Sequence, residues 1–227
     1  MGKPEVLAEN LDRWGADEII LQCIDRSRNN AGPDFEALSK IANKGLGTPI
    51  TYAGGVRTAE DAIRVVQSGA DRIALDALLH DSPSTVIELS HKLGAQALVA
   101  SLPVSHVNNE LRWYDYRSQQ HKPFSAELLQ LLKDKVISEV MLIDWQHEGQ
   151  ENGFQLDLIH NFPACNTPII AFGGLSSTKI IGEALSLTSV SATAIGNFLS
   201  YKEHAIASYK QQLCEFPIRM PYSDGVL

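Results

Sequence analysis

A nine-residue pattern occurs twice in this chain and constrains the fold more than any other feature of the sequence. The copies are TPITYAGGV, residues 48–56, and TPIIAFGGL, residues 167–175. Each is a short apolar run ending in a glycine pair, and each is followed by a helix-like stretch and a second apolar run. The repeated order of strand, glycine turn, helix and strand predicts a fold made of two similar halves.

The glycine pairs indicate where a ligand binds. Glycine lets the backbone approach a ligand closely, and N–H groups at the start of the next helix attract anions. Two such places related by an approximate twofold axis predict a ligand with a phosphate at each end. The alternative is that each glycine pair only makes a tight turn between a strand and a helix.

Composition narrows the class of protein. With 227 residues, 44% of them hydrophobic, the chain can bury a full core, and we expect one domain, residues 1–227. The net charge of −8 argues against nucleic acid or an anionic membrane surface as a partner. Phosphate binding is therefore expected to rely on local backbone N–H groups. No apolar run is long enough for a membrane span and no leader is present, so we expect neither a membrane protein nor a secreted one.

The three cysteines are far apart in the sequence. Cys23, Cys165 and Cys214 have no metal-ligand spacing, which is typical of a reduced cytoplasmic protein. We expect no bound metal and no organic cofactor.

Apolar runs alternate with longer amphipathic stretches along the whole chain. Strands buried on both faces are expected at residues 18–24, 49–52, 72–75, 97–102, 139–144, 168–172 and 191–195. Helices are expected at residues 4–14, 33–44, 58–69, 84–93, 124–135, 154–163, 177–187 and 198–215. This alternation predicts a parallel sheet with right-handed crossovers.

Two architectures fit that alternation. A doubly wound open sheet suits seven strands, whereas the repeat favours an α/β barrel of the TIM (βα)8 type, made of two half-barrels, whose first strand is missing from the chain. Residues 104–116 alternate in polarity around Asn108-Asn109, which predicts a β-hairpin inserted after the strand at 97–102.

A series of segments in register resembles one enzyme family. The segments are GADEII at 15–20, GGV at 54–56, GADRI at 69–73, GAQALV at 94–99, Trp113-Tyr114, Glu148-Gly149, Gly153-Phe154, FGG at 172–174 and YKE at 201–203. They resemble the cyclase subunit of imidazole glycerol phosphate synthase, and more distantly the phosphoribosyl-formimino isomerase of the same histidine pathway. The resemblance implies an eight-stranded barrel, a substrate with two terminal phosphates, and a glutaminase partner that supplies ammonia.

The resemblance also assigns phosphate-binding positions. One phosphate would meet the first half-site, which comprises Gly54, Gly55, Asp76 and Ala77. The other would meet the second half-site, which comprises Gly149, Gly173, Gly174, Gly196 and Asn197. The family usually has Asn where this chain has Asp76, and a carboxylate beside a phosphate is repulsive. The second half-site is therefore expected to bind phosphate better.

The catalytic positions depart from the family. Its cyclases use two aspartates, at the ends of the first and fifth barrel strands, as general acid and base. The first has no counterpart in this sequence, and Pro103 stands at the second. Cys23 and Gln146 replace two further family aspartates, and Glu148 is a conservative substitute for a third acid.

Acids at other strand ends are the remaining catalytic candidates, because a barrel does its chemistry at the carboxyl ends of its strands. They are Glu148, Asp25 and Asp144, beside Asp76 of the first half-site, with the alternative that Asp25 and Asp144 cap helices or face solvent. Cys23 is either a nucleophile or inert packing. His147 is either an acid or base or a solvated loop residue, and Trp145 either stacks on a ligand or covers the barrel.

Two functions from different classes remain open. One is a cyclase or lyase acting on a sugar-bisphosphate-like substrate with ammonia from a glutaminase. The other is a non-cyclising barrel that binds a ligand or passes ammonia in a sugar amidation pathway. Unpaired strand edges would have to be covered, either by residues 216–222, with a short strand at 218–220, or by self-association into a homo-oligomer.

Overall fold

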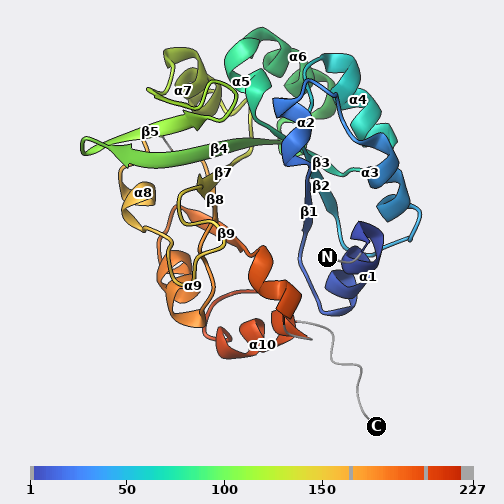
Figure 1. The fold of residues 1–227 in the computed structure, drawn as a ribbon, viewed down its shortest axis with the longest axis vertical. Helices are drawn as coiled ribbons and strands as arrows, with labels where there is room; N and C mark the ends of the chain where they lie inside the picture. The colour runs from blue at the N-terminus through green and yellow to red at the C-terminus, as the bar shows by residue number, and fades with distance from the viewer. Residues whose placement is uncertain (1–2, 164–165, 202–203, 221–227) are drawn as a thin grey trace.

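The computed structural model describes residues 3–163, 166–201 and 204–220. Its centre is a curled sheet of parallel strands with helices on the outside, consistent with a TIM-type barrel (Figure 1). The parallel strands, in sheet order, are β1 (Ile19–Gln22), β2 (Ile50–Ala53), β3 (Arg72–Leu75), β4 (Leu98–Val107), β7 (Glu139–Asp144), β8 (Ile169–Phe172) and β9 (Val190–Ala194). All seven predicted strands are therefore confirmed, and the curl of the sheet decides for the barrel over the open sheet.

The strands are buried on both faces, as their near-continuous apolar runs predicted. Inward-facing residues form a small cluster that includes Ala53, Ala74, Val99, Met141 and Ile170. Outward-facing residues join the much larger core beneath the helices. Side chains therefore fill the barrel at mid-height, and a ligand has room only at the ends of the strands.

Most of the predicted helices are present with slightly shorter bounds. These are α1 (Pro4–Arg13), α3 (Phe35–Ala42), α4 (Ala59–Gln67), α6 (Pro83–Leu93), α7 (Ala126–Lys133), α9 (Thr178–Leu185) and α10 (Ala205–Gln212). The best signalled start is that of α4, where Thr58 accepts from the backbone of Asp61 and Asp61 accepts from the backbone of Thr58.

The structure differs from the expected helices at five places in the described part of the chain. The first strand ends at Gln22, because Ile24 already begins the short helix α2 (Ile24–Arg28). Helix α5 (Ala77–Asp81) and the 3-10 turn η1 (Ala95–Ala97) were not predicted. The helix expected at 154–163 is only α8 (Asp157–His160), since Pro163 cannot continue it. The stretch 198–215 is broken into the 3-10 turn η2 (Asn197–Tyr201) and α10, and residues 202–203 between them lie outside the described ranges.

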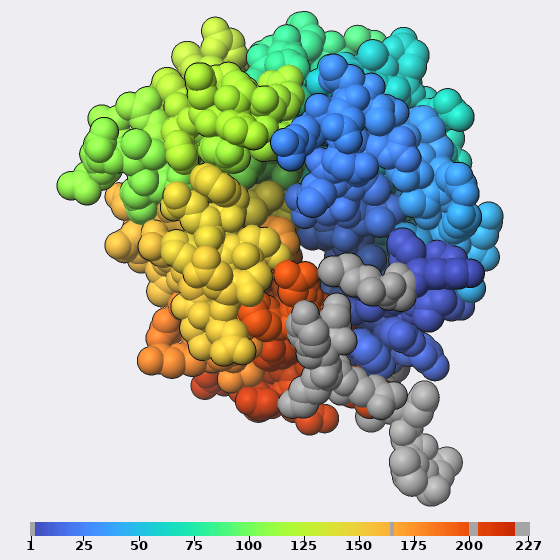
Figure 2. Space-filling model, in the orientation of Figure 1, coloured from blue at the N-terminus to red at the C-terminus, as the bar shows by residue number. Residues whose placement is uncertain are grey.

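The predicted hairpin is confirmed and is larger than expected. Strand β4 continues beyond the barrel to Val107 and turns at Asn108 and Asn109, both at positive φ. The chain returns as β5 (Glu110–Asp115) and adds β6 (Gln120–Lys122), which the sequence did not predict. In the space-filling view the hairpin (green) packs against the segment that follows β7 (yellow) (Figure 2).

The described part of the tail bridges the two ends of the sheet without forming a strand. Residues 218–220 are irregular, so the strand expected there is wrong as far as the described residues reach. Instead, the Lys210 ammonium lies 2.7 Å from an Asp17 carboxylate oxygen and donates to the carbonyl of Arg219. The Arg219 guanidinium in turn donates to Asp17 and to the carbonyl of Ala16. These contacts join α10 to the loop before β1.

Candidate functional site

Both glycine pairs lie at the carboxyl ends of their strands, Gly54-Gly55 after β2 and Gly173-Gly174 after β8. All four have positive φ. A Cβ on Gly54 would lie 2.3 Å from the carbonyl oxygen of Cys23, and one on Gly173 would lie 2.5 Å from that of Asp144. The first glycine of each pair is thus required by close packing on the chain that leaves the neighbouring strand. This part of the repeat supports the tight-turn alternative.

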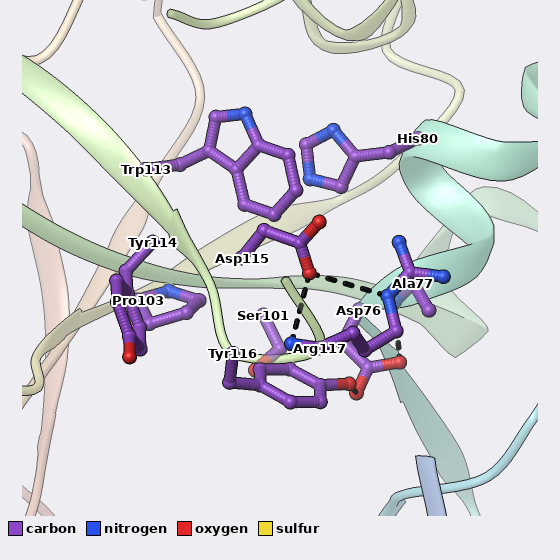
Figure 3. Close-up of a pocket in the computed structure, with 10 residues that line it drawn as sticks. All are labelled: Asp76, Ala77, His80, Ser101, Pro103, Trp113, Tyr114, Asp115, Tyr116 and Arg117. Atoms are coloured by element: carbon purple, nitrogen blue, oxygen red, sulfur yellow. Dashed lines mark hydrogen bonds and ion pairs between the residues drawn. The ribbon is translucent and has the colours of Figure 1, made fainter. Parts of the chain in front are cut away.

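In the first half-site, the groups that would face a phosphate bind one another. The backbone N–H of Gly55 donates to the Ser27 hydroxyl over 2.8 Å, and this hydroxyl donates to Oδ2 of Asp76, also over 2.8 Å. The N–H of Ala77 donates to Oδ1 of Asp76, and the Tyr116 phenol donates to Oδ2. The Asp76 carboxylate therefore binds the donors of Ser27, Ala77 and Tyr116 directly and reaches the Gly55 N–H through Ser27. Figure 3 shows Asp76, Ala77 and Tyr116 side by side.

The end of the hairpin is fastened over the first half-site. Arg117 makes a bidentate ion pair with Asp81 of α5, at 2.6 and 3.0 Å. The rings of His80 and Trp113 stack with their centroids 3.7 Å apart (Figure 3). Burial, followed by the nearby Arg117 charge, lowers the pKa of His80 to about 4. The stack therefore holds a neutral imidazole at neutral pH.

Asp115 organises the same turn from within. It is 3% exposed and accepts from Arg117, Ser118 and Lys122. Burial alone would raise its pKa, but these donors outweigh burial and hold the pKa of Asp115 well below its usual range.

The second half-site differs because three of its backbone donors have no acceptor among the described residues. The carbonyl of Gly174 accepts from the N–H of Gly153. Within the described ranges, however, no protein group accepts from the backbone N–H of Gly174, Gly196 or Asn197. Gly174 is buried. Backbone N–H groups in such a place usually bind a ligand or water, so this half-site is open to an anion.

Loop 145–153 brings the remaining predicted residues to the second half-site. A Cβ on Gly149 would lie 3.2 Å from the amide nitrogen of Asn197, and one on Gly196 would lie 3.2 Å from a Glu148 carboxylate oxygen. Partial desolvation, followed by the nearby charge of Asp144, raises the pKa of Glu148. Glu148 is therefore the one predicted catalytic acid that lies against the second half-site.

The other two predicted acids lie elsewhere. Asp25 is exposed in the first turn of α2. Asp144 is 1% exposed, and it accepts from the His147 ring over 2.8 Å and from the backbone N–H of Gln155 over 3.0 Å. It shares the helix-facing side of β7 with Leu142, so it fixes the loop after β7 instead of lining the barrel interior. The structure does not gather the three acids into one set.

Aromatic side chains cover the barrel mouth between the two half-sites. Tyr114 of β5 stacks on Trp145 with centroids 3.9 Å apart, and Trp145 packs against the apolar cluster inside the barrel. Pro103 is a member of β4, paired with Ile143, and lines the same small cavity as Tyr114. Burial raises the pKa of the Cys23 thiol, which favours its interpretation as inert packing.

Sequence reasoning missed Ser27, Tyr116, Arg117 and His80. None belongs to a motif. The roles of Tyr116, Arg117 and His80 depend on the hairpin folding back onto α5, and that of Ser27 depends on α2 lying against Gly55 and Asp76.

Charged side chains close the opposite end of the barrel. Arg72 at the start of β3 lies 3.2 Å from Glu18, which precedes β1, and 2.5 Å from Glu139 at the start of β7. Strands β1 and β7 are not neighbours in the sheet, so these contacts cross the barrel interior. Ser191 of β9 also donates to Glu139.

Comparison with known proteins places this geometry in a family. The model of a family described as "Histidine biosynthesis protein" matches residues 1–205. The chain belongs to this family. It is 26% identical over 212 residues to the imidazole glycerol phosphate synthase subunit HisF of Exiguobacterium sp. (strain ATCC BAA-1283 / AT1b), covering 92% of this chain and 82% of that protein. It is 27% identical over 217 residues to the protein of the same name from Lysinibacillus sphaericus (strain C3-41), covering 93% and 85%.

Family membership confirms the resemblance seen in the sequence.

Across the described ranges, no helix has the length and apolar character that a bilayer span needs. The same ranges hold no group of three or more His, Cys, Asp or Glu side chains suited to a metal ion.

Proposed function

We propose that this barrel binds a phosphorylated small molecule through its second half-site and has little or no cyclase activity. The observation that carries the proposal is the difference between the half-sites. Asp76 occupies the donors of the first, whereas the N–H groups of Gly174, Gly196 and Asn197 in the second have no protein acceptor in the described ranges.

The chemistry of the mouth supports a low cyclase rate. A positioned general acid or base contributes about 10²- to 10⁴-fold to a rate. Pro103 cannot supply one, Asp76 is bound by three donors, and Asp144 is turned toward the helices. Glu148 alone remains beside the second half-site, and its raised pKa suits a proton donor.

Phosphate titration tests the binding. Gly174→Asp places a carboxylate among the donors, and Asn197→Asp does so at an exposed position with less backbone strain. Both should weaken binding of inorganic phosphate at least tenfold. Gly45→Asp adds the same charge at a positive-φ glycine with open space around it, so it should bind as the unaltered chain does. Equal binding by all four proteins would refute the proposal.

An activity assay tests the chemistry. The chain, given free ammonia and the substrate of the family's cyclase, should turn over at least 10²-fold more slowly than a HisF subunit such as the relatives above. Any residual rate should fall further in Glu148→Gln. A rate equal to that of HisF would refute the low-activity proposal.

A second candidate function is that of an ammonia-passing partner of a glutaminase in a sugar amidation pathway in the cytoplasm. The ion-paired group of Glu18, Arg72 and Glu139 favours it, because it closes the end of the barrel opposite the half-sites with charged side chains instead of apolar packing, and a docked partner would deliver ammonia at that end. Sedimentation with a glutaminase subunit should show a complex of one chain of each. No complex at concentrations of about 10 μM would count against this candidate.

A further inference from the structure

We infer that the ligand of this barrel carries a single phosphate, because Asp76 stands permanently in the place of a second one. This rests on the proposed function, since it assumes that the second half-site binds the phosphate. It narrows the ligand class from bisphosphates to phosphate monoesters with an uncharged far end.

The hydrogen-bond donors of the first half-site are already used within the protein. A phosphate in the first half-site would need the N–H groups of Gly55 and Ala77 and neighbouring hydroxyls. The Gly55 N–H is already bound by Ser27, the Ala77 N–H by Asp76, and the hydroxyls of Ser27 and Tyr116 both donate to Asp76. Ser27 is 2% exposed, so its hydrogen bonds are not shared with bulk water. The network is complete without a ligand.

The cavity beside Asp76 is too small for a second phosphate. Asp76, Ala77, His80, Ser101, Trp113 and Tyr116 line the cavity between α5 and the hairpin. Its volume is about 10 Å³, which is room for at most one water molecule. The His80–Trp113 stack and the Arg117–Asp81 ion pair hold the hairpin down over it. A phosphate does not fit between Asp76 and the hairpin.

The charges around the cavity also disfavour a phosphate. Among the described residues, Arg117 is the only cationic side chain lining this cavity, and it is already paired with Asp81 and Asp115. No lining cation is left to offset the repulsion between Asp76 and a phosphate dianion. At Asp76 and Ala77, the donors, the space and the charge therefore all disfavour a phosphate.

Matched sugar phosphates test the inference. Fructose 6-phosphate and fructose 1,6-bisphosphate differ by one phosphate, and the unaltered chain should bind them with affinities within about threefold, as measured by calorimetry. Asp76→Asn removes the charge and Asp76→Ser also vacates volume while keeping a helix-capping residue. Each should raise the preference for the bisphosphate at least tenfold. In parallel, phosphorus NMR should count one inorganic phosphate per unaltered chain and two per variant.

Asp25→Asn is the control, because it removes one charge from the same rim at an exposed side chain, and it should leave the preference unchanged. A tenfold preference of the unaltered chain for the bisphosphate, or two phosphates per unaltered chain, would overturn the inference and leave the proposed function standing. Variants that gain no preference and no second phosphate would overturn the role of Asp76. If the unaltered chain binds no phosphate at all, both the inference and the proposed function fail.

Discussion

The carboxylate of Asp76 accepts a hydrogen bond from the phenol of Tyr116, forty residues further along the chain. Asp76 lies between β3 and α5 and is the N-cap residue of that helix, and Tyr116 follows the returning strand of the hairpin. The sequence repeat predicts a phosphate site at this end of the barrel. With this contact, the polar groups there form a hydrogen-bond network that is complete without a ligand. It also explains why two halves with matching glycine turns offer such different surfaces to a ligand.

Removing the phenol should cost stability. Tyr116→Phe deletes a hydrogen bond to a charged acceptor, and we expect the free energy of unfolding in urea to fall by about 1–2 kcal/mol. Tyr114→Phe is the matched control, since Tyr114 is on the same hairpin and its stacking on Trp145 survives the change. It should shift the unfolding free energy by less than about 0.5 kcal/mol. Equal losses in the two variants would show that the Tyr116–Asp76 bond contributes nothing.

Stability should depend on pH through His80. Its pKa is about 4 in the folded chain against an ordinary 6.5, so between these values the unfolded chain binds the proton more readily. Stability is therefore present above pH 6.5 and falls as the pH is lowered toward 4, by about 1–3 kcal/mol. Asp115 acts in a separate window, because its lowered pKa makes its contribution fade only below its ordinary value of 3.8.

The control for this pH dependence is His80→Phe, which keeps an aromatic ring against Trp113 but cannot titrate. Unfolding free energies measured from pH 7 to pH 4 should fall less steeply in this variant than in the unaltered chain. Identical slopes would mean that His80 is not the group responsible.

The ion-paired group of Glu18, Arg72 and Glu139, at the amino ends of the strands, should contribute more to stability than surface ion pairs do. Arg72→Ala leaves Glu18 and Glu139, whose side chains are 28% and 21% exposed, without their partner. We expect a loss of about 2–4 kcal/mol in urea unfolding. Lys92→Ala breaks an exposed pair with Glu88 and should cost less than about 0.5 kcal/mol. A loss for Arg72→Ala no larger than for Lys92→Ala would show that the ion pairs of Arg72 are as well solvated as a surface pair.

The barrel could be predicted from the sequence because its signals are local and repeated. Apolar runs such as 139–144 fix the strands, and caps such as Thr58 fix the helix starts. Short helices were missed because they lack a full amphipathic period: α5 follows a strand directly and is capped by Asp76 itself. The need to cover unpaired strand edges predicted a strand at 218–220. Ion pairs of Lys210 and Arg219 to Asp17 bridge the sheet ends instead.

The candidate site was less predictable. The repeated glycine pairs and the family resemblance predicted where the two half-sites lie, and the charge of Asp76 predicted their order of affinity. The sequence could not show that Ser27 and Tyr116 would meet at Asp76, because that depends on two long-range contacts, across 49 and 40 residues. For the same reason, Asp144 was taken for a candidate acid when its hydrogen bonds fix a loop.

The last prediction concerns the join between the ends of the sheet. Lys210 is only 7% exposed, and its ammonium holds Asp17 and the carbonyl of Arg219 together. Lys210→Met keeps the packing of the stem and removes these bonds, so the unfolding free energy should fall by about 1–2 kcal/mol. Lys133→Met, at an exposed position in the last turn of α7, should stay within about 0.5 kcal/mol of the unaltered chain.

Deletion of residues 216–227 should cost more than Lys210→Met, because it also removes Phe216, which packs beside Gly182 of α9. It should further change the sedimentation of the protein, since the sheet ends lose their bridge. A truncated chain with unaltered stability and sedimentation would show that the tail does not join α10 to the loop before β1.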